Sequence, residues 1–241
     1  MNARACALLL AVIPLTTGAG ITTRVTLDVK GRGEVFIVSE TSLDEAKRLE
    51  AVADPRLRDS LLVRQMLAPP LEVSRLLTRQ GFSEVAVRQY TKENLRTEVT
   101  ARISDVRPLT ACCGGELTFS RKPGDFLELN GTLGGALAGQ DVDLAPLKNL
   151  HVTLRIDFPG SVCDDTDNAA RASHIGNSVA YGWPADRLLA GPTPVHVRIV
   201  PDIEGTPYFW LALILGVTAL VVVGAFIVLR HGREAMAAPG E

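Results

Sequence analysis

Two segments of this sequence alternate apolar and polar residues, and this pattern constrains the fold more than any other feature. Ile21 to Val29 and Val152 to Phe158 place an apolar side chain at every second position. Because successive side chains of a β-strand point to opposite faces of a sheet, such alternation predicts strands with one buried face. Further strands are expected over Gly33–Ser39, Phe82–Tyr90, Val99–Ile103, Leu117–Phe119, Phe126–Leu133, Val179–Trp183 and Val195–Ile199. Within one of these segments, Asn130-Gly131 is typical of a hairpin turn.

A helical block lies between the second and third of these expected strands. Ser42 followed by Glu45 forms a capping box that predicts a helix start. Asp54 is typical of an N-cap and precedes a helix expected over 55–67, with a third helix expected over 70–80. Strands, then helices, then a long run of strands indicate an α+β fold. We therefore expect a curved antiparallel β-sheet packed by two or three helices.

The two ends of the chain are expected to lie outside this domain. Residues 1–19 contain a short apolar run and end in small residues, the pattern of a signal peptide with cleavage near Ala19. Tyr208 to Leu229 carries no charge and no proline and is long enough for a transmembrane helix. Basic residues follow that segment, which predicts a cytoplasmic tail over 230–241. The domain between the ends, residues 20–204, is then extracytoplasmic, and the localisation is the cell membrane with a single pass.

Composition excludes one class of partner. The whole chain has 25 Lys and Arg against 27 Asp and Glu, so its formal net charge is -2. No basic excess is present to neutralise a run of phosphates, and only 5% of the residues are aromatic. Nucleic acid is therefore not an expected partner.

Three cysteines remain in the domain once the expected signal peptide is removed. They are Cys112, Cys113 and Cys163, an odd number in an oxidising compartment. One disulfide is expected, joining Cys163 to Cys112 or Cys113, and Cys163–Cys113 is adopted as the working pair. The neighbouring cysteines are not expected to pair with each other, because a disulfide between them strains the peptide bond. No ligand spacing for a metal is present, so no metal site is expected.

No catalytic motif stands out in the sequence. The segment Gly176 to Ala180 approaches the G-x-S-x-G pattern around Ser178, but it does not follow a strand and open a helix as a nucleophile elbow does. His151 and His196 fall on the polar side of alternating strands, where solvated histidines are ordinary. The chain is therefore expected not to be an enzyme and to need no cofactor.

Strong curvature of the sheet would leave an apolar cavity between the helices and the inward strand residues, and such a cavity suits acyl chains. A solid core made by the same residues is the alternative.

Several segments resemble the LppM-type domain of actinobacterial envelope lipoproteins. They are Ile103-Ser-Asp-Val106, Val152 to Gly160 with its Phe-Pro-Gly end, and Val179 to Pro184. The resemblance implies an extracytoplasmic α/β domain similar to lipid-binding cup folds, which binds envelope glycolipids such as phosphatidylinositol mannosides. The chain departs from a lipoprotein in lacking a cysteine after the small residues of the signal. Tyr181 and Trp183 are candidate ligand-binding residues at the cavity mouth, with packing in the core as their alternative role.

These observations predict a membrane-anchored, non-catalytic domain that binds a lipid or glycolipid component of the cell envelope. The alternative is an envelope adaptor, a structural module that docks another protein of unknown identity. The two differ in whether the domain contains unfilled apolar volume.

Overall fold

The structure is a computed structural model that describes residues 19–165, 171–201 and 218, with the backbone alone for residues 164, 165 and 171–174. The chain divides into two units, Met1–Pro201 and Asp202–Glu241, and Thr218 is the one residue of the second unit that is described. Apart from Ala19, the expected signal peptide lies outside the described residues and stays a prediction. The strands of the first unit are β1 (Gly20–Leu27), β2 (Gly33–Ser42), β3 (Ser83–Thr91), β4 (Asn94–Ile103), β5 (Gly115–Lys122), β6 (Phe126–Gly134), β7 (His151–Asp157), β8 (Gly160–Asp165), β9 (Arg171–Ile175), β10 (Ser178–Pro184) and β11 (Pro192–Pro201).

The strands form two sheets rather than the single antiparallel sheet that the sequence predicted. Seven strands lie in the order β3-β4-β2-β1-β7-β10-β9, and four lie in the order β5-β6-β11-β8. The larger sheet is mixed, because β1 pairs with β7 in parallel, with Arg24 opposite Arg155. The predicted fold class is therefore wrong in sheet number and strand direction. Alternation along a strand fixes which side chains share a face, but it carries no information about the neighbour or its direction.

The Asn130-Gly131 pair does not make a turn, because both residues lie inside β6. Gly131 has φ +145°, and a Cβ atom there would lie 1.9 Å from the carbonyl oxygen of Glu116 on β5. The glycine is thus required by a close approach of two backbones. The turn between β5 and β6 instead contains Gly124 and Asp125, which have φ values of 86° and 61°.

The helices are α1 (Leu43–Glu50), α2 (Pro55–Arg58), α3 (Leu61–Leu67), α4 (Pro70–Arg79) and α5 (Ala185–Ala190), with 3-10 turns η1 (Arg107–Thr110) and η2 (Ala145–Leu147). Two helices begin where the capping residues predicted, α1 after Ser42 and α2 after Asp54. The Ser42 side chain accepts a hydrogen bond from the backbone N–H of Glu45 at 3.2 Å, as the capping box required. The helix expected over 55–67 is two helices, because the Ser60 side chain caps a new helix by accepting from Val63 N–H.

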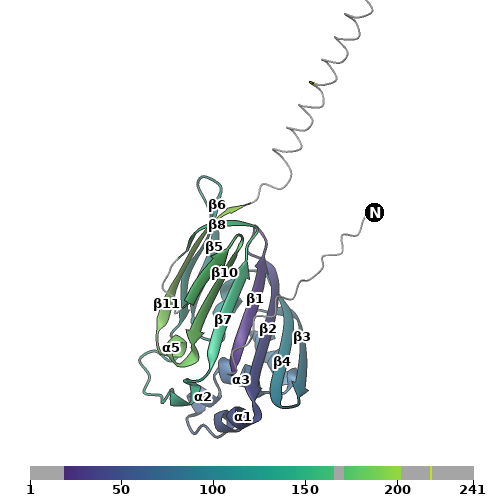
Figure 1. Cartoon of the computed structure of the whole chain (residues 1–241), viewed down its shortest axis with the longest axis vertical. Helices are drawn as coiled ribbons and strands as arrows, with labels where there is room; N and C mark the ends of the chain where they lie inside the picture. Colours follow the sequence, from purple (N-terminus) through teal and green to yellow (C-terminus); the bar gives the residue numbers. More distant parts are fainter. Residues whose placement is uncertain (1–18, 166–170, 202–217, 219–241) are drawn as a thin grey trace, which may run out of the picture. The chain divides into compact units, whose positions relative to one another are not determined.

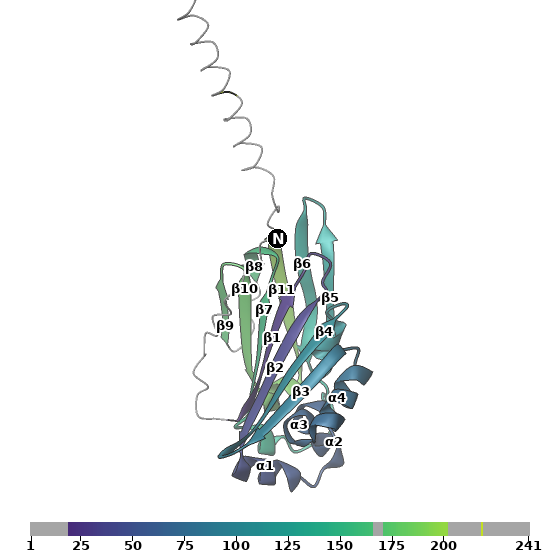
Figure 2. The same ribbon diagram turned by 90° about the vertical axis from the view of Figure 1, so that its right-hand side faces the viewer.

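One hydrophobic core lies between the two sheets and the helices. Figure 2 shows α1 to α4 and strands β5 and β6 on the same side of the seven-stranded sheet. We call the face of that sheet toward them its inward face and the opposite face its outward face. Figure 1 is viewed toward the outward face, with the helices behind the strands. The inward residues of the strands and the apolar faces of the helices belong to a single cluster of buried side chains.

The transmembrane part of the predicted fold is corrected by the structure. Among the described residues, no helix is both long enough and apolar enough to cross a membrane. The predicted span, Tyr208 to Leu229, lies outside the described residues except for Thr218, as does the expected tail over 230–241. The prediction rested on the length of an uncharged segment. That length shows that the segment could cross a bilayer, but not that it forms a transmembrane helix.

Candidate functional site

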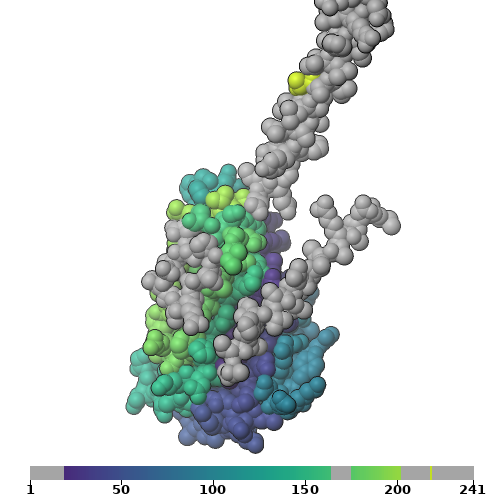
Figure 3. All heavy atoms as spheres, in the orientation of Figure 1, coloured from purple at the N-terminus to yellow at the C-terminus, as the bar shows by residue number. Residues whose placement is uncertain are grey.

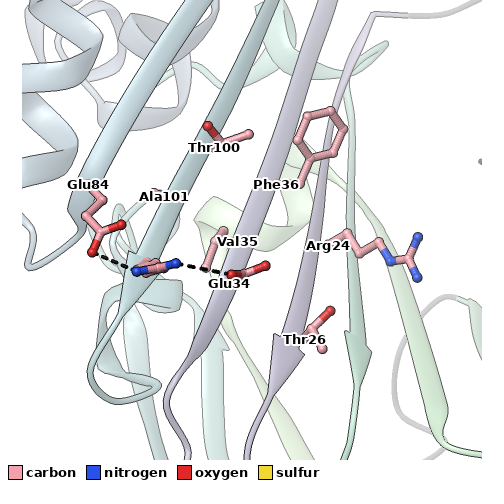
Figure 4. A pocket seen from close by; sticks show the side chains of 9 residues that line it. Arg24, Thr26, Glu34, Val35, Phe36, Glu84, Thr100 and Ala101 are labelled. Carbon is pink, nitrogen blue, oxygen red and sulfur yellow. Dashed lines mark hydrogen bonds and ion pairs between the residues drawn. The ribbon is translucent and has the colours of Figure 1, made fainter. Parts of the chain in front are cut away.

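A hollow of about 600 Å³ lies on the outward face of the seven-stranded sheet. Strands β1 to β4 supply its lining residues, which are Arg24, Thr26, Glu34, Val35, Phe36, Glu84, Thr100, Ala101 and Arg102 (Figure 4). In the space-filling view of this face, residues of β1, β7 and β10 form the molecular surface themselves (Figure 3). Outward residues of β1, β2 and β4 line the hollow, so it lies on the face of the sheet opposite to α1–α4 and not between the helices and the sheet.

The sizes of neighbouring side chains account for open space beside Phe36 on this face. On one cross-strand row of the outward face, Phe36 of β2 pairs with Arg24 of β1 on one side and with Thr100 of β4 on the other. Thr100 in turn pairs with Ala86 of β3. Opposite residues in a sheet stand about 5 Å apart, so the short side chains of Thr100 and Ala86 leave open space beside the Phe36 ring.

A chain of ion pairs forms one rim of the hollow. Arg102 Nη1 lies 2.8 Å from Glu84 Oε1, and Arg102 Nη2 lies 3.6 Å from Glu34 Oε1. Glu84 has φ +51° and sits where the β3–β4 register shifts between Ser83 and Ala86. Such a bulge redirects a side chain. All three charged side chains are more than half exposed, so these pairs add little to stability and mainly define the edge of the hollow.

A second hollow of about 210 Å³ shares Phe36 and Thr100 with the first. Ala86, Arg88 and Glu98 complete its lining. Glu98 accepts a hydrogen bond from Arg96 at 3.0 Å, whereas Arg88 makes no ion pair with any described residue. We call the combined lining of the two hollows the outer groove; it contains three arginines and three glutamates, namely Arg24, Arg88, Arg102, Glu34, Glu84 and Glu98. The groove therefore has no net formal charge.

A hydrogen-bonded cluster fixes one edge of the outer groove. Arg24 Nε donates to Asp157 Oδ2 at 2.7 Å, and Arg155 Nε donates to Asp157 Oδ1 at 3.1 Å. Ser178 donates its hydroxyl to Asp157 and accepts from Arg155 Nη2 at 3.2 Å. Asp157 is only 7% exposed, while the Arg24 side chain is 42% exposed. The buried carboxylate therefore holds Arg24 in place and leaves its terminal amino groups available to a ligand.

The pKa of Asp157 lies below the ordinary value of an aspartate. Burial is the largest single effect and acts to raise this pKa. The hydrogen bonds from Ser178, Arg24 and Arg155 together outweigh it, because each stabilises the ionised carboxylate. Asp157 is thus a structural anion that orients two arginines.

Among the described residues, the space found between the helices and the sheet is much smaller than the expected cavity. A hollow there, which we call the inner hollow, has room for about 20 Å³ and is lined by Thr23, Ile37, Leu61, Gln65, Leu77, Phe82, Pro108, Leu109, Ala111 and Cys112. That space accommodates a water-sized group and not an acyl chain. The alternative of a solid core therefore describes this region better than the curved, vacant sheet that the sequence suggested.

Tyr181 and Trp183 lie in the core, as the alternative reading of these residues supposed. They are 1% and 4% exposed, and their rings stack with centroids 5.5 Å apart and planes at 17°. Both point inward from β10, and neither lines the outer groove or the inner hollow. Their position gives them a packing role.

The disulfide expected between Cys163 and Cys113 is not formed, since Cys112, Cys113 and Cys163 are all free. The thiol of Cys163 lies 3.3 Å from the carbonyl oxygen of Arg198 on β11. The carbonyl of Cys113 accepts a hydrogen bond from Ala136 N–H, two residues after Gly134. Gly134 pairs with Pro192, so Cys113 lies near the start of β11. Six residues of strand separate Pro192 from Arg198, about 20 Å at 3.3 Å per residue. A disulfide requires Cα atoms within about 7 Å, so Cys113 and Cys163, which lie near opposite ends of this stretch, are too far apart to pair.

Cys112 and Cys113 instead lie against each other, with their sulfur atoms 3.5 Å apart. Hydrogen bonding between them is the main cause that lowers the pKa of the Cys112 thiol and raises that of Cys113 well above its ordinary value. Burial raises the pKa of Cys113 further.

Ser178 begins strand β10 after a turn and does not stand at a strand-to-helix elbow. Of the two histidines considered as bases, His196 lies 3.4 Å from Glu128 on the four-stranded sheet, and His151 begins β7. Within the described ranges, no group of three or more His, Cys, Asp or Glu residues is placed to hold a metal ion.

The residues of the outer groove were missed by reasoning from sequence alone, although β2 held a signal. Four apolar residues in succession, Val35 to Val38, interrupt the alternation of that strand. One of each neighbouring pair must therefore point outward, and Phe36 does so. A large aromatic residue at an outward strand position marks a candidate contact surface.

Comparison with known proteins gives a distant likeness among solved structures. No protein-family model and no curated protein matches the chain. The NMR structure of the folded domain of the Mycobacterium tuberculosis LppM protein is similar, with a TM-score of 0.42 and 12% identity, covering 78% of this chain and 94% of that one.

Proposed function

We propose that this chain is a non-catalytic binding module of the cell envelope that holds a lipid or glycolipid in the outer groove. The observation that carries this proposal is the hollow of about 600 Å³ beside Phe36 on the outward face of the seven-stranded sheet. Hollows of about 300–1,000 Å³ are typical of sites for small molecules. The placement in the envelope rests on the signal peptide predicted from residues 1–19. The proposed ligand site is on the outward face of the sheet, whereas the sequence predicted a cavity on the inward face.

The chemistry of the outer groove favours a sugar-bearing head group over a simple anion. Its formal charges cancel, so no excess positive charge selects a phosphate. The hydroxyls of Thr26 and Thr100, the arginine donors and the glutamate acceptors match sugar hydroxyl groups, which both donate and accept hydrogen bonds. Phe36 presents an aromatic ring, and Ala86 adds apolar surface beside it for the attached acyl chain.

The cluster around Ser178 supports a binding role rather than a catalytic one. Its hydroxyl is bonded to Asp157 and Arg155, and Asp157 is committed to two arginines. A serine nucleophile needs an adjacent base that can take its proton. A carboxylate whose pKa is lowered is a weak base, so this arrangement supports orientation of Arg24.

Calorimetric titration of the full chain with octyl glucoside, kept below its micelle concentration, tests the proposal. This probe has both a sugar and an apolar chain. Glucose alone and octyl tri(ethylene glycol), which has the same chain without the sugar, separate the two contributions. The proposal predicts saturable binding of octyl glucoside, at least tenfold tighter than either control. Equal affinity for the two octyl compounds would contradict recognition of the sugar.

Substitution of Phe36 by Leu tests the position of the site. We expect the affinity for octyl glucoside to fall about two- to tenfold, because an aromatic contact contributes roughly 0.5–1.5 kcal/mol beyond its buried area. Phe126→Leu is the matched control, since Phe126 is also a partly exposed phenylalanine on a strand but lies on β6 of the other sheet. An equal loss of affinity in both variants would place the ligand elsewhere.

The adaptor alternative has one observation in its favour. Strand β3 is an edge of the seven-stranded sheet, and Tyr90 on it is 47% exposed. An edge strand offers unpaired backbone groups to a strand of another protein. Titration of the chain with octyl glucoside that gives no heat and no shift in thermal unfolding would favour this docking role over lipid binding.

A further inference from the structure

The neighbouring thiols of Cys112 and Cys113 are held in a fixed arrangement between η1 and β5. Their sulfur atoms are 3.5 Å apart. The backbone N–H of Cys113 donates to the carbonyl of Thr110 at 3.2 Å, and the carbonyl of Cys113 accepts from Ala136 N–H at 2.9 Å. Cys113 is 2% exposed, whereas Cys112 is half-buried. One thiol of the pair is thus reachable from outside while the other is enclosed.

A buried hydrogen-bond donor lines the inner hollow together with Cys112. Gln65, on α3, is 2% exposed, and its side-chain Nε2 has no hydrogen-bond partner. Both residues line the inner hollow of about 20 Å³, which has room for a water-sized group. Buried polar groups are nearly always hydrogen-bonded, so an unpartnered amide beside a thiol indicates a small ligand that carries an acceptor.

The spacing of the two sulfurs matches one bonding geometry better than others. Thiolate bonds of about 2.3 Å place the sulfurs of a linear S–metal–S unit about 4.6 Å apart. Two bonds of that length meeting at a right angle place them about 3.3 Å apart. The observed 3.5 Å fits the second geometry, which is that of a pyramidal trivalent centre. A tetrahedral zinc site needs further ligands, and no cluster of three or more His, Cys, Asp or Glu exists in the part of the chain that the structure describes.

We propose that Cys112 and Cys113 form a chelating site for a trivalent, thiophilic metalloid of the arsenite class. Arsenous acid, As(OH)₃, loses two of its As–O bonds as the two S–H bonds break and two As–S bonds form. The two thiol protons leave with the two hydroxyl groups as two molecules of water, and no atom changes oxidation state. The remaining As–OH oxygen occupies the inner hollow and accepts a hydrogen bond from Gln65 Nε2. This site is independent of the outer groove, which lies on the opposite face of the sheet.

Protection from alkylation tests the site in the unmutated chain. The full chain is reduced with a phosphine, incubated with sodium arsenite, and treated with iodoacetamide before peptide mass spectrometry. We expect arsenite to slow the alkylation of Cys112, the reachable thiol of the pair, at least tenfold, while Cys163, exposed and alone on β8, reacts at its original rate. Equal rates for Cys112 with and without arsenite would overturn the proposal.

Variants then assign the ligands. In a Cys6→Ser, Cys163→Ser background, bound arsenic after desalting is expected to be one atom per chain. Cys112→Ala should lower retention at least tenfold, and Gln65→Leu should retain the stoichiometry but weaken binding several-fold. Near-ultraviolet circular dichroism confirms that each variant is folded. Full retention of arsenic by the folded Cys112→Ala variant would show that the pair does not chelate and would refute the site.

Discussion

The inward and outward faces of the seven-stranded sheet share the same strands but differ in where they leave space. Inward residues such as Val25, Ile37 and Ile156 are at most 4% exposed and pack into one cluster with the helices and the second sheet. The hollow on that side has room for about 20 Å³. On the outward face, a hollow of about 600 Å³ lies beside Phe36 and Thr100, and a second of about 210 Å³ is lined by the same two residues and Ala86.

The two faces show that one alternating pattern has two separate consequences: its inward residues form the core, and its outward residues form the surface on which a ligand can bind. The inward set of residues is selected for volume, because unfilled space in a core costs stability. The outward set is free to vary in length, and adjacent long and short side chains produce a groove. Mutations on the two faces should therefore separate stability from ligand binding.

The largest expected effect comes from Trp183, the inward residue that the sequence offered as a ligand contact. Trp183→Ala removes a 4% exposed ring that stacks on Tyr181, and should cost about 3–5 kcal/mol of unfolding free energy. Urea denaturation followed by circular dichroism measures this loss. The fraction that remains folded should bind octyl glucoside with unchanged affinity, and a loss of affinity with little loss of stability would return Trp183 to the ligand site.

The next effect compares two neighbours on β2 that face opposite ways. Ile37→Ala, on the inward face, should cost about 2–5 kcal/mol. Phe36→Ala, on the outward face, should cost less than half as much, because its ring is already partly in contact with solvent. Binding of octyl glucoside should show the opposite order, with the larger loss in Phe36→Ala. The same order in both assays would break the separation of the two faces.

Asp157 gives a third, pH-dependent effect. Its folded pKa is lowered, so its contribution to stability is complete above the unfolded value of about 3.9 and is lost as the pH falls through the folded value. Asp157→Asn should cost about 1–3 kcal/mol at pH 7, and the difference from the unmutated chain should shrink below about pH 4. Urea denaturation at a series of pH values measures it.

Asp105 provides the matched control for that experiment. Its pKa is also lowered, mainly by a hydrogen bond from Arg107, but the pair is exposed. Asp105→Asn should therefore cost less than about 0.5 kcal/mol at every pH. An equal pH dependence in the two variants would contradict the view that burial of Asp157 makes its cluster different.

The smallest effect on stability is expected at the rim of the outer groove. Arg102→Ala removes exposed ion pairs with Glu84 and Glu34 and should change the unfolding free energy by less than about 0.5 kcal/mol. The affinity for octyl glucoside should nevertheless fall severalfold, because a donor of the groove is lost. Calorimetry and urea denaturation on the same sample test both parts, and an unchanged affinity would remove Arg102 from the site.

Sequence reasoning located most elements because their signals are local. The alternation of residues 21–27 and 152–156 predicted β1 and β7, and Ser42 and Asp54 marked helix starts that the structure confirms. Strand partners, the parallel β1–β7 pair and the division into two sheets were not predictable, since they depend on contacts between distant segments. Gly131 shows the same limit, because its role is set by the approach of β5.

The candidate site was less accessible to sequence reasoning than the fold. Phe36 interrupts an alternating strand, which marks it as unusual, but the open space beside it depends on Ala86 and Thr100, about fifty and about sixty residues later respectively. The prediction of open space on the inward face followed from the expected curvature of the sheet, which does not specify what packs against that face. The packing of a second sheet and four helices against that face fills it.

A crystal structure of the full chain grown with octyl glucoside tests the central claim most directly. The account predicts the glucosyl group beside Phe36, within hydrogen-bond distance of Thr100 or Arg102, on the outward face of the seven-stranded sheet. Electron density for the octyl chain among α3, α4 and the inward strand residues, with the outer groove empty, would contradict it.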